Sequence, residues 1–178
     1  IRVNLQDGTT VGVTVGGSVD HNITSIENIT GTNQADIITG SESKNVFVGM
    51  GGSDTITGIA GNNVMYGGTM ERNSASTDVD TIYGGKGNDT IYGAAGADDL
   101  RGGLGDDTIY TGAGDDIVRS GIGEDTLYGE AGNDTFVFEA ADNMTNLVFG
   151  GNETTDNGSL DMVDYRQAIK GQIGRAHV

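Results

Sequence analysis

The sequence predicts an all-β solenoid, in which short strands and turns repeat along one axis, and three observations support this fold class. An Asp or Asn returns every nine residues between residues 31 and 137, with one longer gap. An apolar residue stands two positions after each of them. Glycines crowd the positions ahead of each Asp, as in GGKGNDTIY from Gly84 and GGLGDDTIY from Gly102. A fixed short period indicates stacked repeats with one chemical task each, rather than a globular enzyme.

Each of the eleven repeats divides into a six-residue turn, which ends at the Asp or Asn, and a three-residue strand. In a strand the middle residue points inward and its neighbours point outward. We therefore expect the apolar residues two positions after the Asp or Asn to form the core: Ile38, Phe47, Ile56, Met65, Ile82, Ile91, Leu100, Ile109, Val118, Leu127 and Phe136.

This pattern resembles the RTX (repeats-in-toxin) calcium-binding nonapeptide GGxGxDxUx, where U is a large apolar residue. The resemblance covers residues 31–137 and implies a right-handed parallel β-roll in which two repeats make one circuit. Repeats then alternate between two faces, which divides the acidic and amide positions into two columns. The odd column is Asp36, Asp54, Asp80, Asp98, Asp116 and Asp134, and the even column is Asn45, Asn63, Asp89, Asp107 and Asp125.

Stacked carboxylates predict a bound cation. Rungs of a sheet lie about 4.8 Å apart, and carboxylates at that spacing repel by about 1 kcal/mol in water and about 3–4 kcal/mol at a lower effective dielectric. Carboxylate and carbonyl oxygens suit Ca²⁺, whereas the chain has no Cys and only two His for zinc or copper. We expect several Ca²⁺ ions, with ligands from Asp36, Asp54, Asp80, Asp89, Asp98, Asp107, Asp116, Asp125 and Asp134.

Two alternatives to this site remain at the level of sequence. Asp and Asn are also common turn residues that hydrogen-bond their own backbone, so the columns could merely cap turns and face solvent. Asn45 and Asn63 carry no charge, and sites that include them should be weak or empty.

The charge balance limits the classes of molecule that the chain is expected to bind. A net charge of −17, from 26 acidic and 9 basic residues, disfavours nucleic acid and anionic lipid. No apolar run is long enough to span a membrane. The expected partners are calcium ions and neighbouring domains of a longer parent chain.

The chain is expected to be organised around the repeats. Residues 1–30 show strand-like alternation and are expected to lead into the roll. An insertion near residues 69–78 should form a loop, because extra residues inside a strand would break the stack. Residues 138–172 are expected to connect to a further unit. Residues 173–178 resemble a translated sequencing adapter and are interpreted as not native.

The sequence predicts no enzyme, because it lacks HExxH, GxSxG and P-loop motifs. The resemblance implies a bacterial protein at the cell surface or secreted by the type I route, folding on calcium after export and acting as a stabilising or spacer module. One alternative is an adhesion module that contacts a glycan or cell-surface ligand. Another is the non-catalytic part of a secreted protease or lipase. The adhesive face would carry an outward tyrosine column, which simple stacking between rungs would also explain: Tyr66, Tyr92, Tyr110 and Tyr128.

Overall fold

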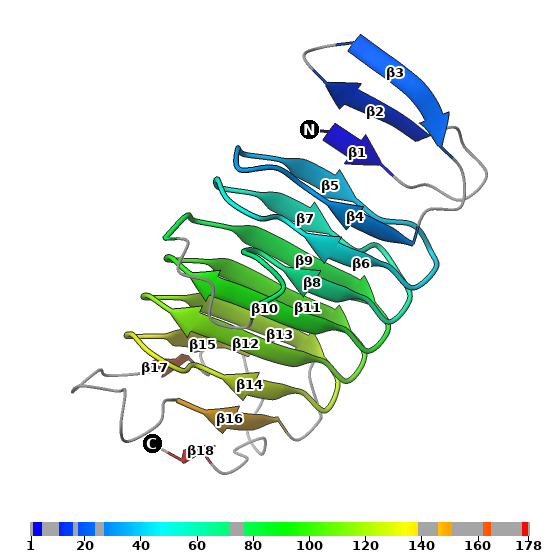
Figure 1. Ribbon diagram of the computed structural model, residues 1–178. Helices are drawn as coiled ribbons and strands as arrows, with labels where there is room; N and C mark the ends of the chain where they lie inside the picture. The colour runs from blue at the N-terminus through cyan, green and yellow to red at the C-terminus, as the bar shows by residue number, and fades with distance from the viewer. Residues whose placement is uncertain are drawn as a thin grey trace.

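The computed structural model describes residues 2–4, 11–15, 18–23, 27–71, 77–138, 146–150, 162–164 and 176–177. Throughout these residues the regular elements are strands, stacked in two sheets that run from β1–β3 at one end to β16–β18 at the other (Figure 1). The predicted fold class, an all-β parallel β-roll, is confirmed. Within the described residues, no helix has the length and apolar character needed to cross a membrane.

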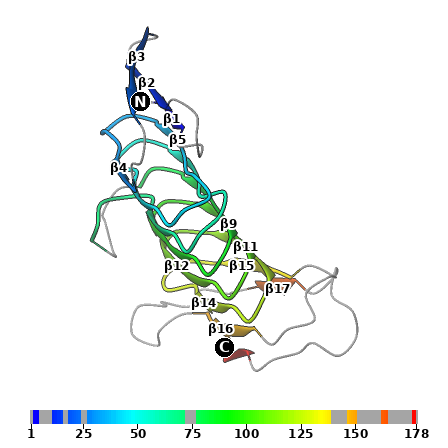
Figure 2. The ribbon, with the colours of Figure 1, turned by 90° about the vertical axis from the view of Figure 1, so that its right-hand side faces the viewer.

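Neighbouring strands of each sheet come from alternate repeats, so that consecutive turns pass from one sheet to the other (Figure 2). The eight-stranded sheet has the order β18 (Ala176–His177), β16 (Leu147–Phe149), β14 (Thr126–Tyr128), β12 (Thr108–Ala113), β10 (Thr90–Ala95), β8 (Val64–Tyr66), β6 (Val46–Val48), β4 (Asn28–Thr30). The ten-stranded sheet has the order β17 (Met162–Asp164), β15 (Thr135–Val137), β13 (Ile117–Ile122), β11 (Asp99–Leu104), β9 (Thr81–Lys86), β7 (Thr55–Thr57), β5 (Ile37–Thr39), β1 (Arg2–Asn4), β2 (Val11–Val15), β3 (Ser18–Ile23).

The pairing is parallel and in register through both stacks, and only the β1–β2 and β2–β3 pairs are antiparallel among the described strands. Equivalent residues of alternate repeats lie side by side, as Ile91 does with Ile109 and Leu100 with Val118. This register aligns every column of the repeat along the roll axis.

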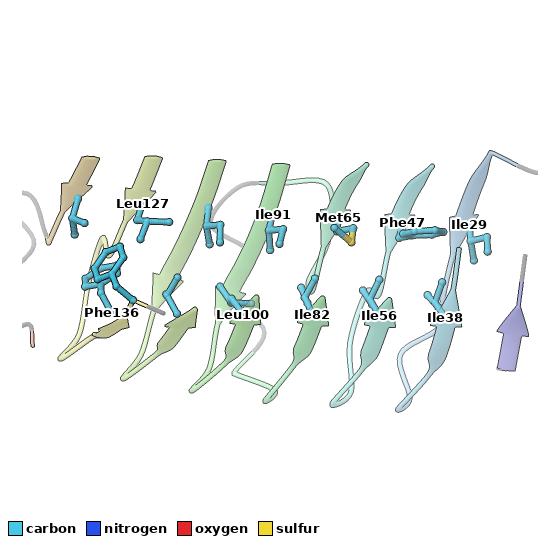
Figure 3. Packing of buried hydrophobic residues seen from close by; sticks show 14 residues of the cluster. Ile29, Ile38, Phe47, Ile56, Met65, Ile82, Ile91, Leu100, Leu127 and Phe136 are labelled. Atoms are coloured by element: carbon cyan, nitrogen blue, oxygen red, sulfur yellow. The ribbon is translucent and has the colours of Figure 1, made fainter. Parts of the chain in front are cut away.

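The core is a double row of single apolar side chains, one from each repeat (Figure 3). All eleven predicted core residues are at most 1% exposed, which confirms the inward position of the repeat. Ile29, Phe138 and Val148 extend the same cluster.

The stack continues past the eleven repeats. At the amino-terminal end, the carbonyl of Glu27 accepts a hydrogen bond of 2.7 Å from the Val46 N–H, and β4 follows as a further strand. At the other end, β16 pairs with β14. The insertion near residues 69–78 falls between β8 and β9, and residues 72–76 are outside the described part. So are most of the predicted connector 138–172 and of the tail 173–178, apart from their short strands.

Glycine at the fourth turn position is required by the stacking of successive turns. Gly114 has a φ of +134°, and a Cβ there would overlap the carbonyl of Gly96 on the rung before. Gly51, by contrast, would place its Cβ 3.6 Å from its nearest neighbour, the Cα of Asn33.

We therefore expect Gly114→Ala to destabilise the calcium-loaded roll, whereas Gly51→Ala should change its stability little. The left-handed conformation alone costs a non-glycine residue about 1–3 kcal/mol, and the overlap with rigid backbone adds to this. Thermal unfolding of the two variants compares them directly. Equal melting temperatures would contradict this account of the turn.

Candidate metal centre

The aspartate side chains point into the roll, where they join successive turns. The members of both columns are only 1–3% exposed. One oxygen of each carboxylate accepts the backbone N–H of the column member on the rung before, as in Asp89 N–H to Asp107 Oδ1 (2.8 Å) and Asp107 N–H to Asp125 Oδ1 (2.9 Å). The odd column is linked in the same way, for example from Asp98 to Asp116 (2.7 Å). The structure therefore brings the predicted residues together in two columns and does not expose them to solvent.

The second carboxylate oxygen is buried without a donor. Oδ2 of Asp54, Asp89, Asp98 and Asp107 has no hydrogen-bond partner within the described part of the chain. In the turn of Asp89, this oxygen and the carbonyl oxygen of Gly102 converge on the space beside Gly84, which a Cβ would fill. An unpaired buried polar atom is costly, and two converging oxygens without a donor between them form a receptor for a cation.

Asn63 shows how the same space is satisfied without a cation. Its Nδ2 lies beside Gly58 as the Oδ2 of Asp89 lies beside Gly84. There it donates to the carbonyl oxygens of Ala60 and Gly61, both at 3.1 Å. At the equivalent place in an Asp turn, the Oδ2 beside Gly84 or Gly102 cannot donate a hydrogen bond. A bound cation can supply the missing positive partner there.

The turns fall into two kinds. From the turn that begins at Gly49 onward, the second and fourth residues have positive φ, except in the turn that carries the insertion. The first two turns have no positive φ and satisfy their own side chains. Asp36 Oδ2 accepts the N–H of Thr32 (2.6 Å), and Asn45 Oδ1 accepts the N–H of Ser41 (3.0 Å). Asp36, although predicted as a ligand, thus lies in a turn of a different geometry from that of Asp89 or Asp107.

Burial raises the pKa of six column aspartates well above the usual value of 3.8. The pKa rises to about 6 for Asp54, Asp89 and Asp98, to about 7 for Asp80 and Asp116, and to about 8 for Asp107. For Asp107, desolvation contributes most and the charges of Asp125 and Asp89 add to it, while the hydrogen bond from the Asp89 N–H opposes the rise. A bound cation can replace these protons, because it offsets the same desolvation and the same repulsion between carboxylates.

The ligand set is oxygen from two sources. Within the described residues, no three or more His, Cys, Asp or Glu side chains gather around one point. Two neighbouring column carboxylates together with backbone carbonyls are therefore the available donors. Such a set suits calcium, which accepts six to eight oxygen ligands in irregular geometry, better than magnesium, which requires a tight octahedron. The residues present fit Ca²⁺.

Asn146 joins the even column and Asp78 lies beside the odd column, and neither follows from the nine-residue spacing. Asn146 extends the even column by accepting the Asp125 N–H at 2.9 Å, 21 residues further along the chain. Asp78 accepts the Gly52 N–H at 2.7 Å, and its charge raises the pKa of Asp54 and of Asp80. Both follow breaks in the nine-residue period. In the sequence, Asn146 is marked by the apolar Val148 two positions later, which is the spacing found in each repeat. Val148 is buried in the structure.

The first turn position is not always glycine. Thr111 and Ser120 hold this position ahead of Asp116 and Asp125, and both are fully buried. The Thr111 hydroxyl donates to the Gly129 carbonyl oxygen. The turns of Asp116 and Asp125 therefore contain a hydroxyl where the turns of Asp89 and Asp107 have glycine.

The predicted tyrosine column is a continuous stack on the eight-stranded sheet. Centroids of neighbouring rings in the series Tyr66, Tyr92, Tyr110, Tyr128 and Phe149 are 4.6–5.0 Å apart, with interplanar angles of 4–7°. The interpretation as stacking between rungs is confirmed. Because each ring covers the face of the next, a ligand along this column meets ring edges only.

A comparison with family models supports the same conclusion as the geometry. The model of the RTX calcium-binding nonapeptide repeat matches residues 24–56, 39–69, 74–109, 101–136 and 110–144, which together span more than half of the chain. The chain belongs to the RTX calcium-binding repeat family, and the resemblance of its sequence is thereby confirmed. No curated protein matched the chain. Within this family the roll is a structural module whose implied ion is Ca²⁺.

Proposed function

We propose that this chain binds several Ca²⁺ ions between successive rungs and that their binding drives its folding. The observation that carries the proposal is the contrast between Asn63 and the buried aspartates. The amide supplies N–H donors to inward carbonyls, whereas the Oδ2 of Asp89 or Asp107 occupies the equivalent place with no donor.

The strongest sites lie between neighbouring column members in contiguous repeats: Asp89 with Asp107, Asp107 with Asp125, Asp98 with Asp116, and Asp116 with Asp134. Asp54 and Asp80 form a further pair, beside which Asp78 adds a carboxylate. Asp36 contributes least, because its Oδ2 already accepts the Thr32 N–H. Backbone carbonyls of the positive-φ turns complete each set.

The biological role follows from the calcium dependence. With one core residue per repeat, burial of apolar side chains stabilises the folded chain only a little. The net charge of −17 destabilises the folded state through repulsion unless cations bind. It would remain unfolded in a low-calcium cytosol during type I secretion and fold outside the cell. There, residues 31–137 act as a stabilising or spacer module of a larger secreted or cell-surface bacterial protein. Residues 1–30 and 138–172 join it to neighbouring domains. The tail 173–178 is not needed for this role, although β18 within it pairs with β16.

The variant Asn63→Asp tests this proposal as a gain of function. It places a carboxylate oxygen against the carbonyls of Ala60 and Gly61, so it should create one further calcium site with Asp89. Calcium bound per chain, measured by equilibrium dialysis with elemental analysis, should rise.

Asn45→Asp is the matched control. It adds the same charge in a turn that satisfies its own side chain through Ser41, so it should add no calcium. A rise in both variants would show a general charge effect. No rise for Asn63→Asp would refute the carboxylate–carbonyl site.

A further inference from the structure

The outer face of the ten-stranded sheet contains a groove of about 410 Å³ across β9, β11 and β13. Its lining residues come from three columns of the repeat. Tyr83, Arg101 and Arg119 hold the last strand position on successive rungs, whereas Leu104 and Ile122 hold the third turn position. Gly103 and Gly121, between these columns, lie in register on neighbouring rungs. Because glycine has no side chain, this middle column leaves a depression that runs along the roll axis.

The fold itself does not require the side chains that form this groove. On the eight-stranded sheet, the third turn position is Ala95 in β10, Ala113 in β12 and Ala131 after β14. Leu104 and Ile122 hold the same position here, and they are 45% and 36% exposed. Large apolar side chains left at a surface position that alanine can fill suggest a contact with a ligand.

The groove is also a positively charged site on an acidic molecule. Arg101 and Arg119 are register partners on neighbouring strands, where like charges repel. Asp99 bridges them at 2.9 Å and 2.6 Å, so that one carboxylate serves two guanidinium groups. Lys86, the register partner of Leu104, adds a further positive charge at the groove edge. A guanidinium has five N–H donors, and the bond from Arg119 to Asp99 uses one of them.

Tyr83 gives the groove an aromatic surface unlike the tyrosine stack. Its register neighbours are Thr57 and Arg101, and its side chain is 43% exposed. No described aromatic ring stacks on it. A ring of this kind can pack against the C–H face of a sugar, which the mutually stacked rings of the opposite sheet cannot do.

We propose that this groove binds a saccharide that carries a carboxylate, such as a uronic or sialic acid. The carboxylate pairs with Arg119 and Arg101 through charge-assisted hydrogen bonds. The sugar ring packs against Tyr83, Leu104 and Ile122. The acidic remainder of the surface repels long polyanions such as nucleic acid, which favours a short acidic sugar in the groove. The inference is separate from calcium binding and requires only the folded roll.

The test uses the full chain in calcium, on an array of sialyllactose, glucuronate-terminated and galacturonate-terminated oligosaccharides beside their neutral parents. At least one acidic group should bind and its neutral parent should not. Arg119→Gln should weaken binding about tenfold or more, and Tyr83→Ala should also weaken it. Lys44→Gln removes the same charge from an exposed turn, and Tyr110→Phe alters the opposite sheet, so neither should change binding.

Circular dichroism and bound calcium, measured on each variant, separate failure of the groove from failure of the roll. If Arg119→Gln does not fold, Leu104→Glu serves instead, because it adds a negative charge at an exposed position and should abolish binding. The proposal is overturned if the folded, calcium-loaded chain binds none of the acidic sugars. It is also overturned if neutral parents bind equally, or if the folded groove variants bind like the native chain.

Discussion

Replacing Asp107 by Asn is expected to remove more bound calcium than replacing Asp36 by Asn. Asp107 lies between Asp89 and Asp125 and is hydrogen-bonded to both, so its carboxylate serves two proposed sites. Asn keeps an Oδ1 acceptor for the Asp89 N–H, as Asn63 does for the Asn45 N–H (2.9 Å). The substitution therefore removes charge but retains the link between turns. Up to two ions per chain should be lost, against one or none for Asp36→Asn.

Calorimetric titration with calcium gives the stoichiometry of both variants. Asp107→Ala extends the comparison, because it also leaves the Asp89 N–H unpaired, at a cost of about 1–3 kcal/mol. The difference between the Asn and Ala variants then gives the contribution of the hydrogen bond separately from that of the bound calcium. Equal calcium losses in Asp107→Asn and Asp36→Asn would contradict a ligand shared between two sites.

Without calcium, the roll should be more stable in acid than at neutral or alkaline pH. Six column aspartates, among them Asp54 and Asp107, have a pKa of about 6 to 8 in the folded chain and near 3.8 when unfolded, so the folded state binds more protons between these values. Stability is then greatest below about pH 4 and falls as the pH rises toward 8. Each pKa unit corresponds to about 1.4 kcal/mol. Most mesophilic proteins, in contrast, lose stability in acid as paired carboxylates are protonated.

Circular dichroism of the calcium-free chain between about pH 4 and pH 8 measures this dependence as the folded fraction at each pH, because the chain is expected to fold in acid and to be disordered at neutral pH. The free energy of unfolding should fall with rising pH, and saturating calcium should reverse the trend, because the ion competes with the protons. Asp107→Asn should flatten the calcium-free dependence, since it removes the group with the highest pKa. A calcium-free stability that increases with pH would show that the carboxylates have other partners.

Much of this architecture is predictable from the sequence because the repeat has a strict period. Each U residue, from Ile38 to Phe136, lies in the core, since register aligns equivalent positions over the whole stack. The two columns follow from the same period, because alternate repeats fall on the same sheet. Where the period breaks, prediction fails: Asn146 and Asp78 join the columns through irregular segments that no spacing rule reaches.

The difference between turns depends on backbone conformation rather than on the Asp itself. Asp36 and Asp54 fit one sequence pattern, yet Thr32 lies at an ordinary φ and Met50 at +87°. The sequence signal for this difference is the fourth turn position, which holds Gln34 and Ser43 in the first two turns and Gly52 in the turn of Asp54. The sequence does not predict the groove either, because the groove arises from three columns that only the strand register places side by side.

The central claim is that calcium between column carboxylates and turn carbonyls holds the roll together. Far-ultraviolet circular dichroism of the full chain at neutral pH, with calcium titrated into chelated protein, tests it most directly. We expect a change from a disordered to a β-rich spectrum at about millimolar calcium, and no such change with magnesium at the same concentration, because magnesium does not suit the irregular oxygen set. A fully β-rich spectrum in excess chelator, unchanged by calcium, would contradict the account.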